Sequence, residues 1–242
     1  MRSGDALRET LVTCRADTLT ARVYRAVNLD YFRTLASTVG AWRGDNRYTA
    51  ANVSEAMYLA QTPDLAMLEA TRQFQRAMST PEFPAYTIIP VAVDLGRVLD
   101  MTREDNQECL ETSLEELTGD WRAAKQRQLK NGRGRVVCHD LGAAAMAAGF
   151  EAIKYISAYD ASRWNIVVFT ENLTAERTLS FVLPDEVIAL QNDDEPDVKT
   201  DLDMALAAAL PESPVAVGLP HSSGGEFCRA SDSPVLSEYF HD

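Results

Sequence analysis

Apolar and polar residues form short, separated patterns along most of the chain, and several of these patterns are typical of β-strands. TARVYRAV (residues 20–27) is rich in β-branched and aromatic residues, and AMYLA (56–60) is a second short apolar run. YTIIPVAVDL (86–95) has strand character interrupted at Pro90. Three later segments have the same character: FEAIKYI (150–156), WNIVVFT (164–170) and TLSFVLP (178–184). We therefore predict strands in all of these segments.

Other segments carry a helical period. Thr62 and Pro63 are residues that favour the start of a helix. After them an apolar residue recurs every four positions, at Ala66, Ala70, Phe74 and Met78. This spacing predicts a helix from Pro63 to about Met78. SLEELTGDWRAAKQRQL predicts one or two helices, and Asp140 is expected to cap a helix LGAAAMAAG that ends at Gly149.

Helices and strands alternate without a regular βαβ rhythm, which predicts an α+β fold. After about Glu186 the chain becomes strongly acidic and then rich in Ser, Gly and Pro. We therefore expect one domain over residues 20–186 and an appendage over residues 187–242.

Composition narrows the classes of protein that fit. The hydrophobic share of 46% is that of a globular protein, and a net charge of −13 argues against general binding to nucleic acid or anionic lipid. No apolar run is long enough to span a membrane, and no signal peptide is visible. The cysteines and histidines lack the spacing of a zinc site or a disulfide framework, so we expect no metal and a cytoplasmic location.

Four motifs occur in a fixed order: VYR, then WRGDNRYTAANVSEAMYLAQTPDLAMLEA, then IIPVAVDLGRVLDMT, and last AAMAAGFEAIKYISAYDASRWNIVVFTENL. The residues in them that have candidate roles are Arg25, Arg47, Tyr48, Tyr58, Glu69, Ser157 and Asn165. With these motifs in this order, the chain resembles the RES family over roughly Ala21 to Pro184. That family is named for its Arg, Glu and Ser and supplies the toxin half of toxin–antitoxin pairs.

The resemblance implies a fold and a function. It implies a split mixed β-sheet with flanking helices, like that of ADP-ribosyltransferases. It implies cleavage of the nicotinamide–ribose bond of NAD, as a glycohydrolase or phosphorylase, with NAD as substrate and no further cofactor. An antitoxin with an Xre-type helix-turn-helix is the expected partner, and a homodimer is a further expectation.

The resemblance assigns catalytic roles to Glu69, Arg25 and Ser157. A carboxylate at Glu69 would stabilise the positive charge that develops on the ribose, whereas the alternative is a surface glutamate paired with Arg72. Arg25 would bind phosphate, and the alternative is a structural ion pair with a carboxylate such as Glu69. Ser157 would bind a ribose or phosphate oxygen, unless it is an ordinary turn serine.

The remaining candidates would bind NAD. Tyr48 and Tyr58 would sandwich the cationic nicotinamide, or would simply be core tyrosines. Arg47 would contact the second phosphate, or would be an exposed loop arginine. Asn165 would position the dinucleotide, or would cap a turn.

Two other functions compete with NAD breakdown. A protein ADP-ribosyltransferase often has a second acidic residue two positions from its glutamate, and the sequence around Glu69 has none. A catalytically weak RES-like binding module is favoured by Asp45-Asn46-Arg47-Tyr48-Thr49, which stands where the family usually has Gly-Gly-Arg-aromatic-Asn.

Overall fold

The structure, a computed structural model, describes residues 1–29, 31, 36–77, 84–132, 135–183 and 186–190. Its strands are β1 (Ala16–Asn28), β2 (Ala56–Ala60), β3 (Tyr86–Asp100), β4 (Ala152–Ile156), β5 (Trp164–Phe169), β6 (Thr178–Leu183) and β7 (Glu186–Leu190). Its helices are α1 (Gly4–Thr13), α2 (Val39–Arg43), α3 (Pro63–Ala77), α4 (Glu104–Cys109), α5 (Leu114–Thr118), α6 (Trp121–Asn131), α7 (Val137–Ala147) and the short 3-10 helix η2 (Thr170–Asn172).

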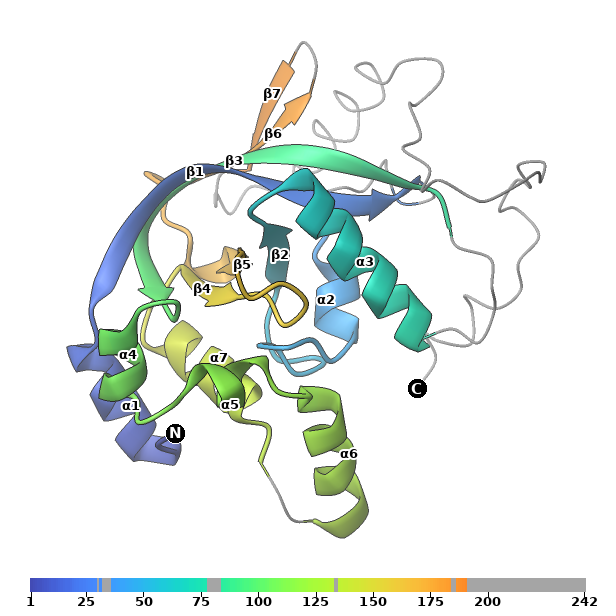
Figure 1. Cartoon of the computed structure of the whole chain (residues 1–242). Coiled ribbons are helices and arrows are strands. Elements are labelled where there is room, and N and C mark those ends of the chain that lie inside the picture. Colours follow the sequence, from blue (N-terminus) through green and yellow to red (C-terminus); the bar gives the residue numbers. More distant parts are fainter. Residues whose placement is uncertain (30, 32–35, 78–83, 133–134, 184–185, 191–242) are drawn as a thin grey trace.

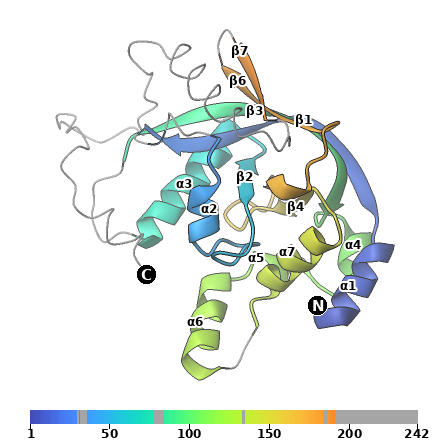
Figure 2. The same ribbon diagram turned by 180° about the vertical axis from the view of Figure 1, so that it is seen from behind.

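The strands form one mixed, seven-stranded sheet in the order β1-β2-β5-β4-β3-β6-β7, with β1 also paired to β3. The β3–β4 pair is parallel, whereas the other pairs are antiparallel. Because β1 pairs with both β2 and β3, strands β1, β2, β5, β4 and β3 form a closed circuit. Figures 1 and 2 show β1 and β3 as a long curved ribbon over the shorter strands β2, β4 and β5. This arrangement agrees with the predicted α+β class.

The core consists of packed clusters on the two sides of the strands. One cluster, which includes Val23, Met57 and Ile166, collects the side chains that β1–β6 turn toward one another. A second packs α1 and α7 against β4 and β5, and a smaller third packs α3 against β1 and β2. The alternation of side chains along each strand therefore decides which residues face the helices.

The helix predicted from Pro63 to about Met78 is α3, and Met78 itself lies outside the described residues. The segment SLEELTGDWRAAKQRQL forms two helices, α5 and α6. Strands β2, β4, β5 and β6 fall within the segments predicted for them, and β1 extends beyond its segment at both ends.

Two sequence expectations were wrong. Strand β3 continues through Pro90, which pairs with Tyr24 of β1 and lies just before β3 gains its second neighbour, β6, at Val91. A proline lacks the backbone donor, so it is tolerated where a strand has an unpaired side. Asp140 lies inside α7 and binds Arg135 rather than capping the helix.

One more strand lies at the end of the sheet, where β7 follows β6 and pairs with it. Residues 187–190 of the expected appendage therefore belong to the sheet, and residues 191–242 lie outside the described part of the chain.

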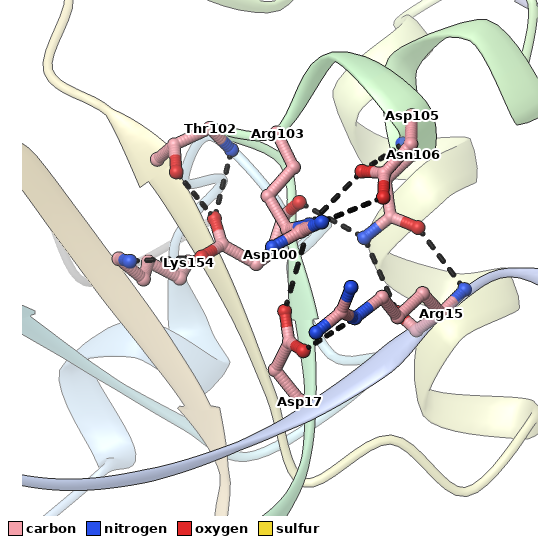
Figure 3. Close-up of polar contacts among 8 residues, drawn as sticks. All are labelled: Arg15, Asp17, Asp100, Thr102, Arg103, Asp105, Asn106 and Lys154. Carbon is pink, nitrogen blue, oxygen red and sulfur yellow. Dashed lines mark hydrogen bonds and ion pairs between the residues drawn. The ribbon is translucent and has the colours of Figure 1, made fainter.

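A polar network fastens β1, β3, β4 and α4 together at one end of the sheet (Figure 3). The buried Asp100 carboxylate accepts bonds from Thr102 and lies 2.8 Å from Nζ of Lys154. The buried Asn106 amide joins backbone groups of Arg15 and Asp100. Because the hydrogen bonds of these polar groups are made within the network, we assign it a structural role.

Candidate functional site

Glu69 lies at the centre of a buried polar group formed by three distant segments. Leu65 is one turn earlier on α3 and fully buried against β1 and β2, so this helix face is turned toward the sheet. The Ser157 hydroxyl and the Asn165 amide Nδ2 both donate to Oε1 of Glu69, each at 2.6 Å. Within the described residues none donates to Oε2, so this oxygen is available to a substrate group.

Glu69 does not form the surface ion pair with Arg72 that the alternative interpretation described. Arg72 donates instead to Oε1 of Gln75 at 3.4 Å. Hydrogen bonds to a charged group contribute about 1.5–3 kcal/mol each, so the two bonds from Ser157 and Asn165 hold the Glu69 carboxylate firmly in one position.

Sheet geometry explains why Ser157 and Asn165 converge on Glu69. Ser157 directly follows β4, and its Oγ also accepts a bond from the Tyr159 amide at 3.1 Å. Asn165 is the second residue of β5 and pairs with Ala60 of β2 on one side and Tyr155 of β4 on the other. The side chains of both residues are almost fully buried, at 2% and 4% exposure.

Two buried polar atoms beside this group have no partner in the described part of the chain. They are Oδ1 of Asn165 and the hydroxyl of Tyr48. Leaving such an atom unsatisfied costs about 1–3 kcal/mol, and native proteins contain few of them. Both unpartnered atoms belong to candidate site residues.

Three tyrosines form a wall next to the Glu69 group. The Tyr58 hydroxyl accepts a bond from the Tyr48 amide at 3.0 Å and lies 3.0 Å from Oγ1 of Thr49. The rings of Tyr48 and Tyr155 are 4.7 Å apart between centroids and tilted by 54°. Burial raises the pKa of all three phenols, so they are neutral at pH 7.

Tyr155 was not among the sequence candidates. Because it stands two positions before Ser157 on β4, strand alternation places its side chain on the same face, and this spacing could have identified it. The nearby Glu69 carboxylate adds to burial in raising the pKa of Tyr155.

Helices α5–α7 hold the loop that carries Arg47 and Tyr48. The His139 ring contacts the Asn46 carbonyl at 2.7 Å, and Arg47 donates to the carbonyls of Leu117 and Gly119 at 2.7 and 3.1 Å. A Cβ atom added to Gly142 would lie 1.7 Å from the Tyr48 carbonyl oxygen, so a glycine is needed for this close approach. Arg47 therefore anchors the loop. It is not the exposed loop arginine that the alternative interpretation of the sequence described.

Arg25 lies on the other side of β1 from α3. Its neighbours Tyr24 and Ala26 pack toward α3, whereas Val23 and Val27, which alternate with Arg25, belong to the core between the strands. Its guanidinium donates to the Ser37 carbonyl at 3.0 Å, and burial lowers its pKa from 12.5 to about 10. Strand alternation thus separates Arg25 from the α3 face that carries Glu69.

A cavity of about 340 Å³ opens beside the Glu69 group. It is lined by side chains of α3 and of the loop after Ser157: Leu68, Arg72, Gln75, Arg76, Ala158 and Tyr159. Sequence reasoning did not select the arginines of this cavity, although their positions three and seven residues after Glu69 place them on its helix face.

Two absences apply to the described residues only. No group of three or more His, Cys, Asp or Glu side chains there could hold a metal ion. None of the helices described has the length and apolar character that a membrane-spanning helix needs.

Comparisons with known proteins agree with this description. The family model for the RES domain matches residues 22–193. A search of curated proteins finds no match. Among solved structures, a chain in the crystal structure of the M. tuberculosis MbcT–MbcA toxin–antitoxin complex superimposes with a TM-score of 0.56 at 20% sequence identity. The match covers 83% of this chain and 98% of that chain, and at this identity it supports a shared fold.

Proposed function

This chain belongs to the RES-domain family, and on that premise we propose that it is a toxin enzyme that cleaves the nicotinamide–ribose bond of NAD. The observation that carries the proposal is the Glu69 carboxylate, held by Ser157 and Asn165 next to buried polar atoms that lack partners. A ribosyl substrate requires a carboxylate that is held in position and has one oxygen without a hydrogen-bond donor. It also requires nearby polar atoms with which it can form hydrogen bonds.

Glu69 supplies the electrostatic part of the reaction. When the bond to the cationic pyridinium breaks, nicotinamide leaves as a neutral molecule and positive charge develops on the ribose carbon and ring oxygen. A fixed carboxylate stabilises this charge, and Oε2 can accept a bond from the ribose 2′-hydroxyl. Because Oε1 is already bonded to Ser157 and Asn165, the carboxylate needs little reorganisation during the reaction.

The neighbouring groups orient the substrate. The tyrosines of this wall are neutral, and in this proposal the cationic nicotinamide ring binds next to them, because a cation is attracted to an aromatic face. Oδ1 of Asn165 accepts from a donor group of the substrate, and the Tyr48 hydroxyl gains a partner in the same way. The role of Arg25 in binding phosphate stays a sequence-based prediction.

NAD breakdown is favoured over transfer to a protein side chain. The positions two residues before and after Glu69 are Met67 and Thr71, so the second acidic residue of many protein transferases is absent at this spacing. Water or phosphate is therefore the proposed acceptor of ADP-ribose.

The purified chain mixed with NAD should release nicotinamide, measured by chromatography with and without inorganic phosphate. The other product identifies the acceptor: free ADP-ribose for water, its phosphorylated form for phosphate, and labelled protein for a transferase. A folded chain that binds NAD but releases no nicotinamide would instead be a RES-like binding module.

The antitoxin is proposed from the similarity to a chain in a toxin–antitoxin complex and from the family. An Xre-type protein encoded beside this chain should bind it and suppress nicotinamide release in the same assay. An adjoining protein of this type that leaves the rate unchanged contradicts the proposed pairing.

A further inference from the structure

Positively charged side chains gather in the cavity beside Glu69, although the whole chain has a net charge of −13. Arg72 and Arg76 extend from α3 into its lining, and Gln75 lies between them. The Arg76 guanidinium lies 5.2 Å from the centre of the Tyr159 ring, which belongs to the loop that follows Ser157. The cavity thus has two arginines, an amide and an aromatic ring.

Among the described residues no ion pair involves Arg72 or Arg76. Both side chains are exposed, so their donors are open to an anion from solvent. Arginine forks bind phosphate oxygens in bidentate pairs, which makes a phosphate group the anion that best fits two guanidiniums and an amide.

We infer that Arg72, Arg76, Gln75 and Tyr159, here called the arginine pocket, bind a phosphate group during the reaction at Glu69. The inference rests on the proposed function and extends it. These residues lie on the α3 side of the sheet.

The position of the pocket along α3 fits this role. With a rise of 1.5 Å per residue, Arg72 and Arg76 lie about 4.5 and 10 Å along the helix axis from Glu69. A phosphate held there is near the ribose that Glu69 stabilises. Two sources share this chemistry: the diphosphate of the dinucleotide, and free orthophosphate that attacks the ribose carbon in place of water.

Binding can be tested without turnover, by thermal melting of the full chain with inorganic pyrophosphate and with orthophosphate. At least one of these anions should stabilise the wild-type chain, and Arg76→Gln should weaken this binding by about tenfold or more. Arg76→Lys should restore only part of it, because an ammonium lacks the planar fork. Arg127→Gln is the matched control, since Arg127 is an exposed arginine of α6 outside the cavity lining and should leave anion binding unchanged.

The inference is overturned if neither anion stabilises the wild-type chain, or if Arg76→Gln binds anions as tightly as Arg127→Gln does. These outcomes are independent of nicotinamide release. If the chain cleaves NAD but is not stabilised by either anion, the proposed function stands and the arginine pocket is wrong. If the chain binds anions in this way but does not cleave NAD, the arginine pocket stands and the proposed function is wrong.

Kinetics then distinguish the two sources of phosphate. If the pocket holds the dinucleotide, Arg76→Gln raises the KM for NAD and leaves the response to orthophosphate unchanged. If it holds free orthophosphate, the same variant leaves the KM for NAD unchanged and raises the orthophosphate concentration needed for acceleration. An Arg76→Gln enzyme with neither change contradicts the inference.

Discussion

At the scale of single residues, the resemblance to the RES family selected side chains that the fold then brings together. Ser157 and Asn165 are 88 and 96 residues from Glu69 in sequence, yet both donate to its carboxylate. Their convergence follows from strand pairing that no local pattern contains. Tyr155 and the arginines of α3 were missed because tyrosines in strands and arginines on helices are common, and only the folded neighbourhood distinguishes them.

Ser157→Ala tests how the Glu69 carboxylate is positioned. The change removes one of its two donors, so the free energy of unfolding should fall by about 1–3 kcal/mol. The kcat for nicotinamide release should fall roughly 10- to 100-fold, because the carboxylate loses its fixed position. Denaturant unfolding and steady-state kinetics measure the two effects.

The control for Ser157→Ala is Ser162→Ala in the same loop. The Ser162 hydroxyl is exposed and bonds to Asp160, away from Glu69. Ser162→Ala should change neither the kcat for nicotinamide release nor the free energy of unfolding appreciably. Equal kinetic effects of the two substitutions would mean that Ser157 is an ordinary turn serine.

At the scale of secondary-structure elements, long periodic segments were predicted well and their partners were not. The four-residue period predicted α3, because a helix that buries one face must repeat its apolar residues at that spacing. The continuity of β3 through Pro90 could not be predicted, because it depends on where β6 begins to pair. The start of α7 was likewise misplaced, since Asp140 binds Arg135 instead of a helix end.

The packing of α7 on the loop of Tyr48 gives a prediction at this scale. Gly142→Ala places a methyl group against the Tyr48 carbonyl, so the loop must move away from α7. We expect a loss of stability of about 1–3 kcal/mol and a higher KM for NAD, since the tyrosine wall is displaced. Thermal melting and nicotinamide-release kinetics measure these changes.

The reverse exchange at an exposed site of the same helix, Ala143→Gly, controls for helix propensity. It should cost only about 1 kcal/mol and leave the KM for NAD unchanged. A Gly142→Ala protein with the KM of the Ala143→Gly protein would show that Tyr48 does not take part in binding.

At the scale of the whole molecule, α3 connects the fold to the chemistry. It packs on β1 and β2 through Leu65 and Ala66. It also carries Glu69 to the ends of β4 and β5, and it lines the cavity with Arg72 and Arg76. The mixture of helices and strands predicted the α+β class. The closed circuit of strands, in contrast, depends on the long-range pairing of β1 with β3.

The central claim is that the Glu69 carboxylate stabilises the ribosyl cation, and Glu69→Gln tests it most directly. The amide keeps the size and removes the charge, so nicotinamide release at saturating NAD should fall roughly 10²- to 10³-fold. The melting temperature and NAD binding should change little, and Glu9→Gln on the exposed face of α1 should keep full activity. A Glu69→Gln protein that releases nicotinamide at the rate of the wild-type chain would contradict the account.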